Sequence, residues 1–124
     1  ISQIVTEELK DEVKNIPLKK SIIPQKKDIK LSYVKALEKY KDSRMQFGEK
    51  HCNSTPIKMV VKNGTDIMLD NRSKETRIIG FMNQKISIAP YDYEVVNVFS
   101  NKLPESILLD CGAQQNVSEI YIER

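Results

Sequence analysis

The chain has 124 residues, enough for one domain built around a single hydrophobic core. Its composition, 40% apolar and 30% charged, is that of a globular protein, and no apolar run approaches the roughly 18 residues that a membrane span requires. The net charge of +3 is uneven, because residues 1–50 hold 12 Lys and Arg against 8 Asp and Glu, whereas residues 51–124 hold 8 against 9.

The first predicted element is an amphipathic helix over residues 1–16, whose apolar residues recur at spacings of three and four. Pro17 ends it, and residues 17–27 read as a linker. Basic residues gather in and just after this linker: Lys19, Lys20, Lys26, Lys27 and Lys30. They could bind anionic lipid, a cell-wall polymer or nucleic acid, although such a charge run more often only solvates a linker.

A second helix is predicted with Asp28 as its N-cap and an end near residues 42–43. Its expected apolar face consists of Leu31, Val34, Leu37 and Tyr40. Because four such side chains would be costly to leave in water, we expect this helix to cover an end or an edge of the β-rich domain. The first helix, beyond the linker, is then the better candidate for binding a partner or a second copy of the chain.

From residue 57 the apolar period changes to two and turn residues recur at short intervals, which is typical of a sandwich or a barrel. Asn63-Gly64 predicts a tight hairpin between the first two strands. Seven strands are predicted, over residues 57–62, 65–71, 75–81, 84–89, 91–99, 106–111 and 117–123.

The segments TDIMLDN (65–71), ISIAPY (86–91), LPESILLDCG (103–112) and VSEIYI (117–122) resemble the ordering of a small cupredoxin domain. There, a strand ends in Asn, a Pro or Gly turn precedes an alternating strand, and a Cys lies just before the final strand. Residues 40–52, with MLDNR (68–72) and DCG (110–112), look like a group of uncharacterised exported proteins of small, reduced-genome bacteria.

The resemblance covers roughly residues 40–124. Combined with the strand pattern, it implies a mainly β fold, a seven-stranded Greek-key β-sandwich of cupredoxin-like build with an N-terminal extension of two helices. We therefore expect a helical basic arm over residues 1–50 and the sandwich over residues 51–124.

The resemblance raises the question of copper. A blue-copper centre needs two imidazoles and a thiolate, usually with a weak axial Met. The chain has a single histidine, His51, and the loop after Cys111 reads GAQQN, with neither His nor Met. We therefore predict a metal-free domain with no cofactor, in which His51 is a surface residue.

Cys52 and Cys111 are the only cysteines. Their spacing and number exclude a CxxC redox motif and a zinc ribbon, and leave a structural disulfide, two buried free thiols or one reactive thiol. The even count and the signs of export favour the disulfide. A weaker indication of compartment is the Asn-x-Ser/Thr triplets, but turns explain two of the four equally well. The triplets begin at Asn53, Asn63, Asn71 and Asn116.

Catalytic arrangements find little support. A nucleophilic triad would have to run through His51, and no glycine-rich phosphate loop exists. The carboxylate pairs Asp66/Asp70 and Asp92/Glu94 each share one strand face, and a solvated face explains them better than acid–base chemistry or the binding of a hard cation does.

The predicted function is therefore a non-catalytic extracellular or cell-envelope domain that serves as an interaction or structural module for a protein or envelope partner. The alternative is surface binding of nucleic acid through the basic arm, and an enzyme ranks third. The chain begins at Ile1 rather than Met, so we also expect that a signal peptide or membrane anchor could precede it.

Overall fold

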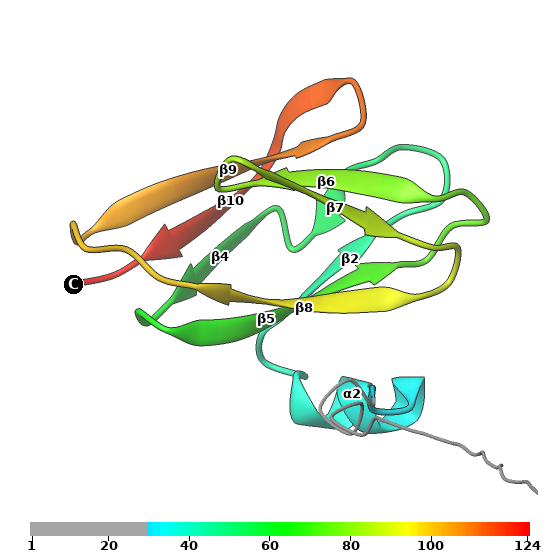
Figure 1. Cartoon of the computed structure of the whole chain (residues 1–124), viewed down its shortest axis with the longest axis horizontal. Helices are drawn as coiled ribbons and strands as arrows, with labels where there is room; N and C mark the ends of the chain where they lie inside the picture. The colour runs from blue at the N-terminus through cyan, green and yellow to red at the C-terminus, as the bar shows by residue number, and fades with distance from the viewer. Residues whose placement is uncertain (1–29) are drawn as a thin grey trace, which may run out of the picture. The chain divides into compact units, whose positions relative to one another are not determined.

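Nine strands in two sheets and one helix make up residues 30–124, the part of the chain that the computed structural model describes (Figure 1). The helix is α2 (Tyr33–Lys39). The strands are β2 (Arg44–Phe47), β3 (Ser54–Thr55), β4 (Lys58–Val61), β5 (Thr65–Asn71), β6 (Arg77–Phe81), β7 (Gln84–Ile88), β8 (Tyr93–Val98), β9 (Glu105–Cys111) and β10 (Gln114–Ile122). The helix predicted over residues 1–16 and the linker after it lie outside the described residues. Within residues 30–124, no helix is long and apolar enough to cross a membrane.

The strands form a five-stranded sheet in the order β4-β10-β9-β6-β7 and a four-stranded sheet in the order β3-β2-β5-β8. Two pairings are parallel, β4 with β10 and β2 with β5, and the others are antiparallel. The prediction of a mainly β sandwich is confirmed. The predicted count of seven strands is wrong, because β2 and β3 were missed.

Strand β2 lies in the segment that was assigned to the helical arm. Met45 and Phe47 are fully buried and alternate with half-buried Arg44 and Gln46, so the strand has the expected period of two. It spans only four residues between a helix and a loop, too few for the pattern to stand out in the sequence. The compact unit of the fold is Ser32–Arg124, and the sandwich thus takes in residues that precede the predicted boundary at residue 51.

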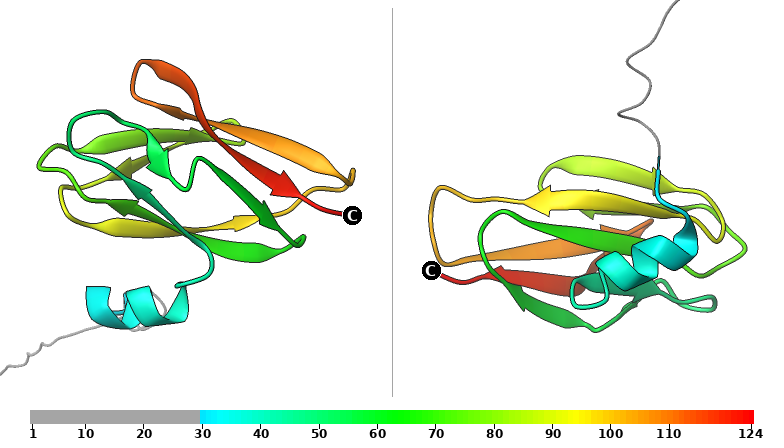
Figure 2. Two further views of the ribbon diagram at one scale, coloured as in Figure 1. Left: turned by 180° about the vertical axis from the view of Figure 1, so that it is seen from behind. Right: turned by 90° about the horizontal axis from the view of Figure 1, so that it is seen from below.

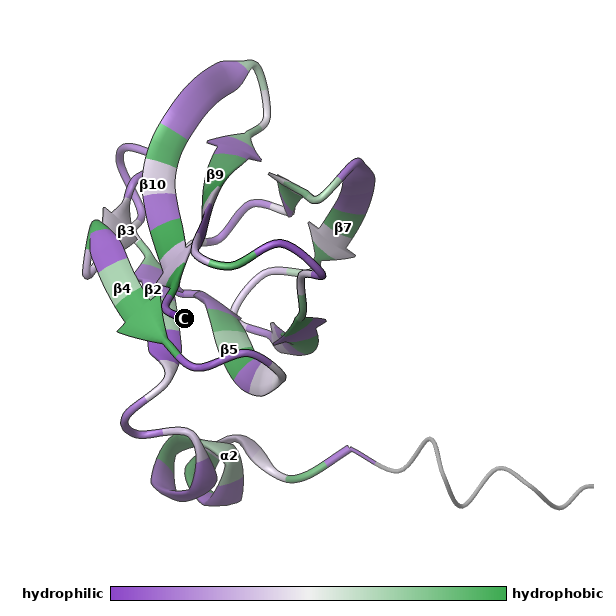
Figure 3. Ribbon diagram, turned by 90° about the vertical axis from the view of Figure 1, so that its left-hand side faces the viewer, coloured by the Kyte–Doolittle hydropathy of each residue, from purple (hydrophilic) through white to green (hydrophobic). Residues whose placement is uncertain are grey.

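The core lies between the two sheets, where alternate side chains of each strand point inward. Figure 3 shows this alternation along β10, where apolar and polar bands follow one another. Aliphatic and aromatic side chains without any solvent exposure fill the interior: Met45, Phe47, Ile67, Leu69, Ile79, Ile88, Val98, Leu109, Ile120 and Ile122.

The Asn63-Gly64 turn does not close a hairpin, contrary to the prediction. Strand β4 belongs to the five-stranded sheet and β5 to the four-stranded one, so the turn carries the chain across the sandwich. Gly64 has a φ of +86°, which suits glycine, and its N–H donates to the carbonyl of Val98 at 2.7 Å. Asn63 exchanges two hydrogen bonds with the backbone of Ser100. The dipeptide therefore marks a turn but does not determine which strands pair.

Helix α2 is shorter than predicted and is rotated about its axis. Its N-cap is Ser32, whose hydroxyl accepts from the N–H of Lys35 at 3.3 Å, and not Asp28. Val34, predicted to be buried, is 74% exposed, whereas Ala36 is fully buried. The contacting residues Tyr33, Ala36, Leu37 and Tyr40 follow the i, i+3, i+4, i+7 spacing of one helix face. The predicted set is spaced by three throughout and therefore drifts around the helix axis, which has 3.6 residues per turn.

The helix covers the outer face of the four-stranded sheet, and not an end or an edge of the sandwich as predicted (Figure 2). Met68 on β5 and Tyr93 on β8 point away from the core, yet they are 0% and 4% exposed because α2 lies over them. These two outward apolar side chains give the helix an apolar surface to pack on.

Candidate functional site

Two clusters of side chains stand out in the described part of the chain. The first, called here the disulfide pole, consists of Cys52, Cys111 and Arg77. Cys111 ends β9 and Cys52 lies in the loop between β2 and β3. The two form a disulfide with a Cα–Cα distance of 5.8 Å, as predicted, and are 6% and 2% exposed. This bond ties the four-stranded sheet's first loop to the five-stranded sheet.

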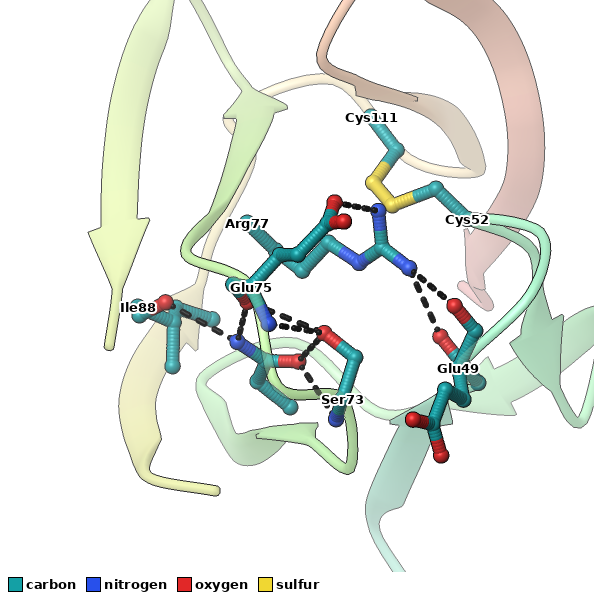
Figure 4. The surroundings of a disulfide bond; sticks show 9 residues. Glu49, Cys52, Ser73, Glu75, Arg77, Ile88 and Cys111 are labelled. Carbon is teal, nitrogen blue, oxygen red and sulfur yellow. Dashed lines mark hydrogen bonds and ion pairs between the residues drawn. A yellow bond between two sulfur atoms is a disulfide. The ribbon is translucent and has the colours of Figure 1, made fainter. Parts of the chain in front are cut away.

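Arg77, at the start of β6, holds the loop that carries Cys52 (Figure 4). Its Nη2 donates to the carbonyl oxygens of Gly48 at 3.0 Å and Glu49 at 2.9 Å, and its Nη1 lies 3.9 Å from a carboxylate oxygen of Glu75. Its Nε is buried and has no hydrogen-bond partner among the described residues. The loop is therefore fixed at two points, by the disulfide and by this guanidinium.

Asn71, at the end of β5, holds the segment between β5 and β6 through its side-chain amide. It is fully buried, and its Nδ2 donates to the carbonyls of Glu75, Ile88 and Ala89 at 2.8 to 3.0 Å. Its Oδ1 accepts from the N–H and the hydroxyl of Ser73. A buried side-chain amide with all these partners satisfied is a structural device that fixes the segment between β5 and β6.

The second cluster, called here the Asp70 cluster, lies beneath the start of α2 on the outer face of the four-stranded sheet. Asp70 is fully buried, and Tyr33 donates its hydroxyl to Asp70 Oδ2 at 2.7 Å. Arg44 Nη2 lies 2.8 Å from the same oxygen, and Arg72 Nε lies 2.7 Å from Oδ1. The Arg72 guanidinium also lies 4.1 Å from the centre of the Tyr33 ring. One carboxylate thus joins the helix to Arg44 on β2 and to Arg72, which directly follows β5.

Burial and the Asp70 carboxylate together shift the pKa values of Tyr33 and Arg44. Burial and the hydrogen bond to the Asp70 carboxylate raise the pKa of Tyr33. Burial by itself would lower the pKa of Arg44, but its hydrogen bonds to Asp70 and Tyr33 outweigh that effect and raise it. The phenol and the guanidinium therefore stay protonated, as expected of a structural clamp.

The residues that the sequence singled out are dispersed. Asp66 is exposed and accepts from Asn97 at 2.9 Å, whereas Asp70 is buried and ion-paired, so these two carboxylates do not form an acid–base pair. Lys30 is exposed, and Lys19, Lys20, Lys26 and Lys27 lie outside the described residues. Sequence reasoning missed Tyr33, Arg44, Arg72 and Arg77 as functional positions. The available signal was Asp70, a carboxylate that directly follows the apolar run over residues 67–69.

No family model matches the sequence, and no curated protein matches it. Solved structures do match. The purple cupredoxin from Nitrosopumilus maritimus aligns over 65% of this chain and 99% of its own, with a TM-score of 0.52 and 11% identity. The fold is cupredoxin-like. A plastocyanin from Dryopteris crassirhizoma aligns over 65% of this chain and all of its own, with a TM-score of 0.52 and 8% identity. A copper binding protein in its apo form aligns over 64% and 84%, with a TM-score of 0.51 and 16% identity.

The cupredoxin-like fold implies copper, but the residues present do not fit it. A copper centre of this class takes a cysteine thiolate and two imidazoles. The sulfur of Cys111 is bonded to Cys52, and the chain has only His51 to supply an imidazole. His51 is exposed beside an open depression of about 360 Å³ that the disulfide lines. Residues 30–124 contain no group of three or more His, Cys, Asp or Glu that could hold a metal ion.

Proposed function

We propose that this chain is a metal-free, non-catalytic module of cupredoxin-like fold that acts outside the cytoplasm, in the cell envelope or the extracellular space. The observation that carries the proposal is the disulfide pole. The sulfur of Cys111 is bonded to Cys52 in a buried disulfide, so this end of the sandwich has no thiolate for copper. What remains of the cupredoxin-like architecture is a scaffold.

The disulfide also supports the proposed compartment. Structural disulfides persist in oxidising environments and are rare in the cytosol, where thiols are kept reduced. Because Cys52 and Cys111 are both nearly inaccessible to solvent, the bond is sheltered from reductants. A buried bond between two sheets is expected of a structural crosslink and not of a redox-active pair.

An interaction role is supported by the outer face of the five-stranded sheet. Val60, Leu108 and Ile78 occupy outward positions on β4, β9 and β6 and are 56%, 51% and 44% exposed. Next to Leu108, the pairing of β6 with β9 stops at Gly80 and Asp110, and an open depression of about 640 Å³ lies between the two strands. Exposed apolar side chains beside an incompletely paired strand are typical of protein interaction surfaces.

Copper addition tests the metal-free claim. We expect the oxidised protein to develop no intense visible thiolate-to-copper band and to take up no stoichiometric copper. The H51A variant serves as the matched control, because it removes any weak binding to the exposed imidazole. An intense visible band in the oxidised wild type would contradict the proposal.

Site-specific photocrosslinking on intact cells of the source organism tests the interaction role. A photoreactive residue at position 108 is expected to give adducts with an envelope or extracellular component. The same residue at position 34, which is exposed on α2 over the other sheet, is the control and is expected to give none. Adducts from position 34 but not from position 108 would contradict the proposed interaction surface on the five-stranded sheet. Recovery of the chain from the cytosol with two free thiols would refute the compartment.

A further inference from the structure

The four Asn-x-Ser/Thr triplets fall into two classes in the structure. Asn71 is fully buried with all its polar atoms engaged, and Asn63 binds the backbone of Ser100 in both directions. The third residues of these two triplets are also engaged. Ser73 donates to Asn71 Oδ1 at 2.8 Å, and Thr65 donates to the carbonyl of Lys62 at 2.6 Å. The fold therefore accounts for both triplets without a modification.

Asn116 belongs to the other class. It is exposed, and its own side chain makes no hydrogen bond within residues 30–124, although its backbone N–H donates to Asp110 Oδ1. It lies in β10 where the register against β9 shifts between Gln114 and Ser118, and it has a φ of +56°. That backbone conformation favours Asn, Asp or Gly, so the conformation alone explains a small polar residue here and does not require an amide.

Ser118, the third residue of the triplet, has no evident use in the fold. It is 4% exposed, and its Oγ is buried without a hydrogen-bond partner among the described residues. A buried hydroxyl with no partner typically costs about 1 to 3 kcal/mol, so packing alone would favour Ala at this position. Asn53, the other exposed acceptor, lacks this second observation because its Thr55 is itself exposed.

We infer that Asn116 is an acceptor site for an N-linked glycan and that the hydroxyl of Ser118 is present because the glycosylating enzyme reads it during export, before the strand folds and buries it. The Asn-x-Ser/Thr triplet is the acceptor signature in secreted proteins. In the reaction, Nδ2 of Asn116 bonds to C1 of the first sugar of a lipid-pyrophosphate-linked oligosaccharide. The bond from C1 to the pyrophosphate oxygen breaks, the lipid pyrophosphate leaves, and the amide loses one proton.

The position fits a bulky substituent. Asn116 follows the β9–β10 connection at the same end of the sandwich as the disulfide, since Gln114 pairs with Cys111 and the N–H of Asn116 donates to the carboxylate of Asp110 at 2.9 Å. A glycan here would shelter the disulfide pole from solvent and from other proteins. This inference rests on the proposed function in one respect, because it requires passage through an export route.

The test uses the full chain secreted behind a cleavable export signal from a cell that has the glycosylating enzyme. Intact mass and enzymatic deglycosylation in ¹⁸O-labelled water, which marks each modified Asn as labelled Asp, identify the occupied sites. We expect glycan on Asn116 of the wild type, loss of it in S118A and N116D, and its retention in S118T. N116D is the matched variant, because Asp keeps the backbone preference and removes the acceptor amide.

The melting temperature supplies a second measurement. S118A is expected to melt at or above the temperature of wild type made in a host without the glycosylating enzyme, since the variant then loses only an unpaired hydroxyl. Absence of glycan at Asn116 in the secreted wild type, or a lower melting temperature of S118A, would overturn the inference. Translation into isolated microsomes gives the same mass readout if the cell retains the chain. The export signal in this test is added to the chain, so an unmodified Asn116 would not bear on the chain's natural compartment. The copper and thiol tests of the proposed function would remain valid.

Discussion

The disulfide pole and the Asp70 cluster both fasten a peripheral segment to the sandwich, but by different physics. The pole joins the loop after β2 to β9 through one covalent bond between buried sulfurs. The Asp70 cluster joins α2 to β2 and β5 through one buried carboxylate that is shared by a phenol and two guanidinium groups. The first acts mainly by restricting the unfolded chain, whereas the second depends on each member of the folded cluster being present.

This difference means that the two regions should fail differently. Loss of the disulfide leaves the folded contacts of both sheets in place and increases the freedom of the unfolded chain. Loss of Asp70 leaves positive charges facing each other inside the folded protein. The variants below are arranged to separate these two kinds of loss.

The largest effect is expected from removal of the disulfide in C52A/C111A. The bond closes a loop with a sequence separation of 59 residues, for which the chain-entropy model gives a stabilisation of roughly 4 kcal/mol. Urea unfolding measures the loss, with the oxidised wild type as reference. A change below about 1 kcal/mol would show that the crosslink contributes little to stability.

Next in size is D70N, which keeps the volume and removes the charge. We expect a loss of about 3 kcal/mol, at the lower end for a broken buried ion pair, because Arg44 and Arg72 are 27% and 25% exposed and can turn partly toward water. D66N on the exposed end of the same strand is the control and should change stability by less than about 0.5 kcal/mol. Equal effects of the two variants would refute the structural role of Asp70.

A smaller effect separates the two possible faces of α2. Leu37 is half-buried against the sheet, so L37A should cost about 1 to 2 kcal/mol, less than the 2 to 5 kcal/mol of a fully buried truncation. Val34 is 74% exposed, and V34A should be nearly neutral. Thermal unfolding of both variants checks the observed orientation, and a larger loss for V34A would instead support the face that the sequence predicted.

The smallest effect is a pH dependence from Tyr33. Burial and the Asp70 carboxylate raise the pKa of Tyr33 above its ordinary value of about 10, so the fold favours the protonated phenol. Its contribution to stability is complete below pH 10 and is lost as the pH rises through the raised pKa. The difference in stability between wild type and Y33F should therefore shrink at alkaline pH. A difference that stays constant up to pH 11 would contradict this coupling.

The disulfide of the pole could be predicted from sequence, whereas the role of Arg77 and the Asp70 cluster could not, for a physical reason. Two cysteines in a chain allow only one intramolecular bond, so Cys52 and Cys111 identify each other once a disulfide is assumed. Asp70 has many potential cationic partners, and its choice of Arg44 and Arg72 depends on the parallel pairing of β2 with β5. That pairing brings Gln46 opposite Asp70 and Arg44 opposite Met68, and no local pattern announces it.

The same limit applies to the fold. The ranges of β5 and β7 follow from alternation and turn residues, and β5 agrees with its predicted bounds at both ends. The local sequence does not show which strands become neighbours, since Asn63-Gly64 connects two sheets instead of two paired strands. The predicted orientation of α2 was wrong for a related reason, because its buried face is determined by long-range packing on Met68 and Tyr93.

The most direct test of a copper-free scaffold closed by a disulfide is a thiol count on denatured, unreduced protein isolated from its natural compartment. The sulfurs of Cys52 and Cys111 are bonded to each other, so the expected result is no reactive thiol before reduction and two after it. Two reactive thiols before reduction would show that the pole is open in the native protein and would contradict the central claim.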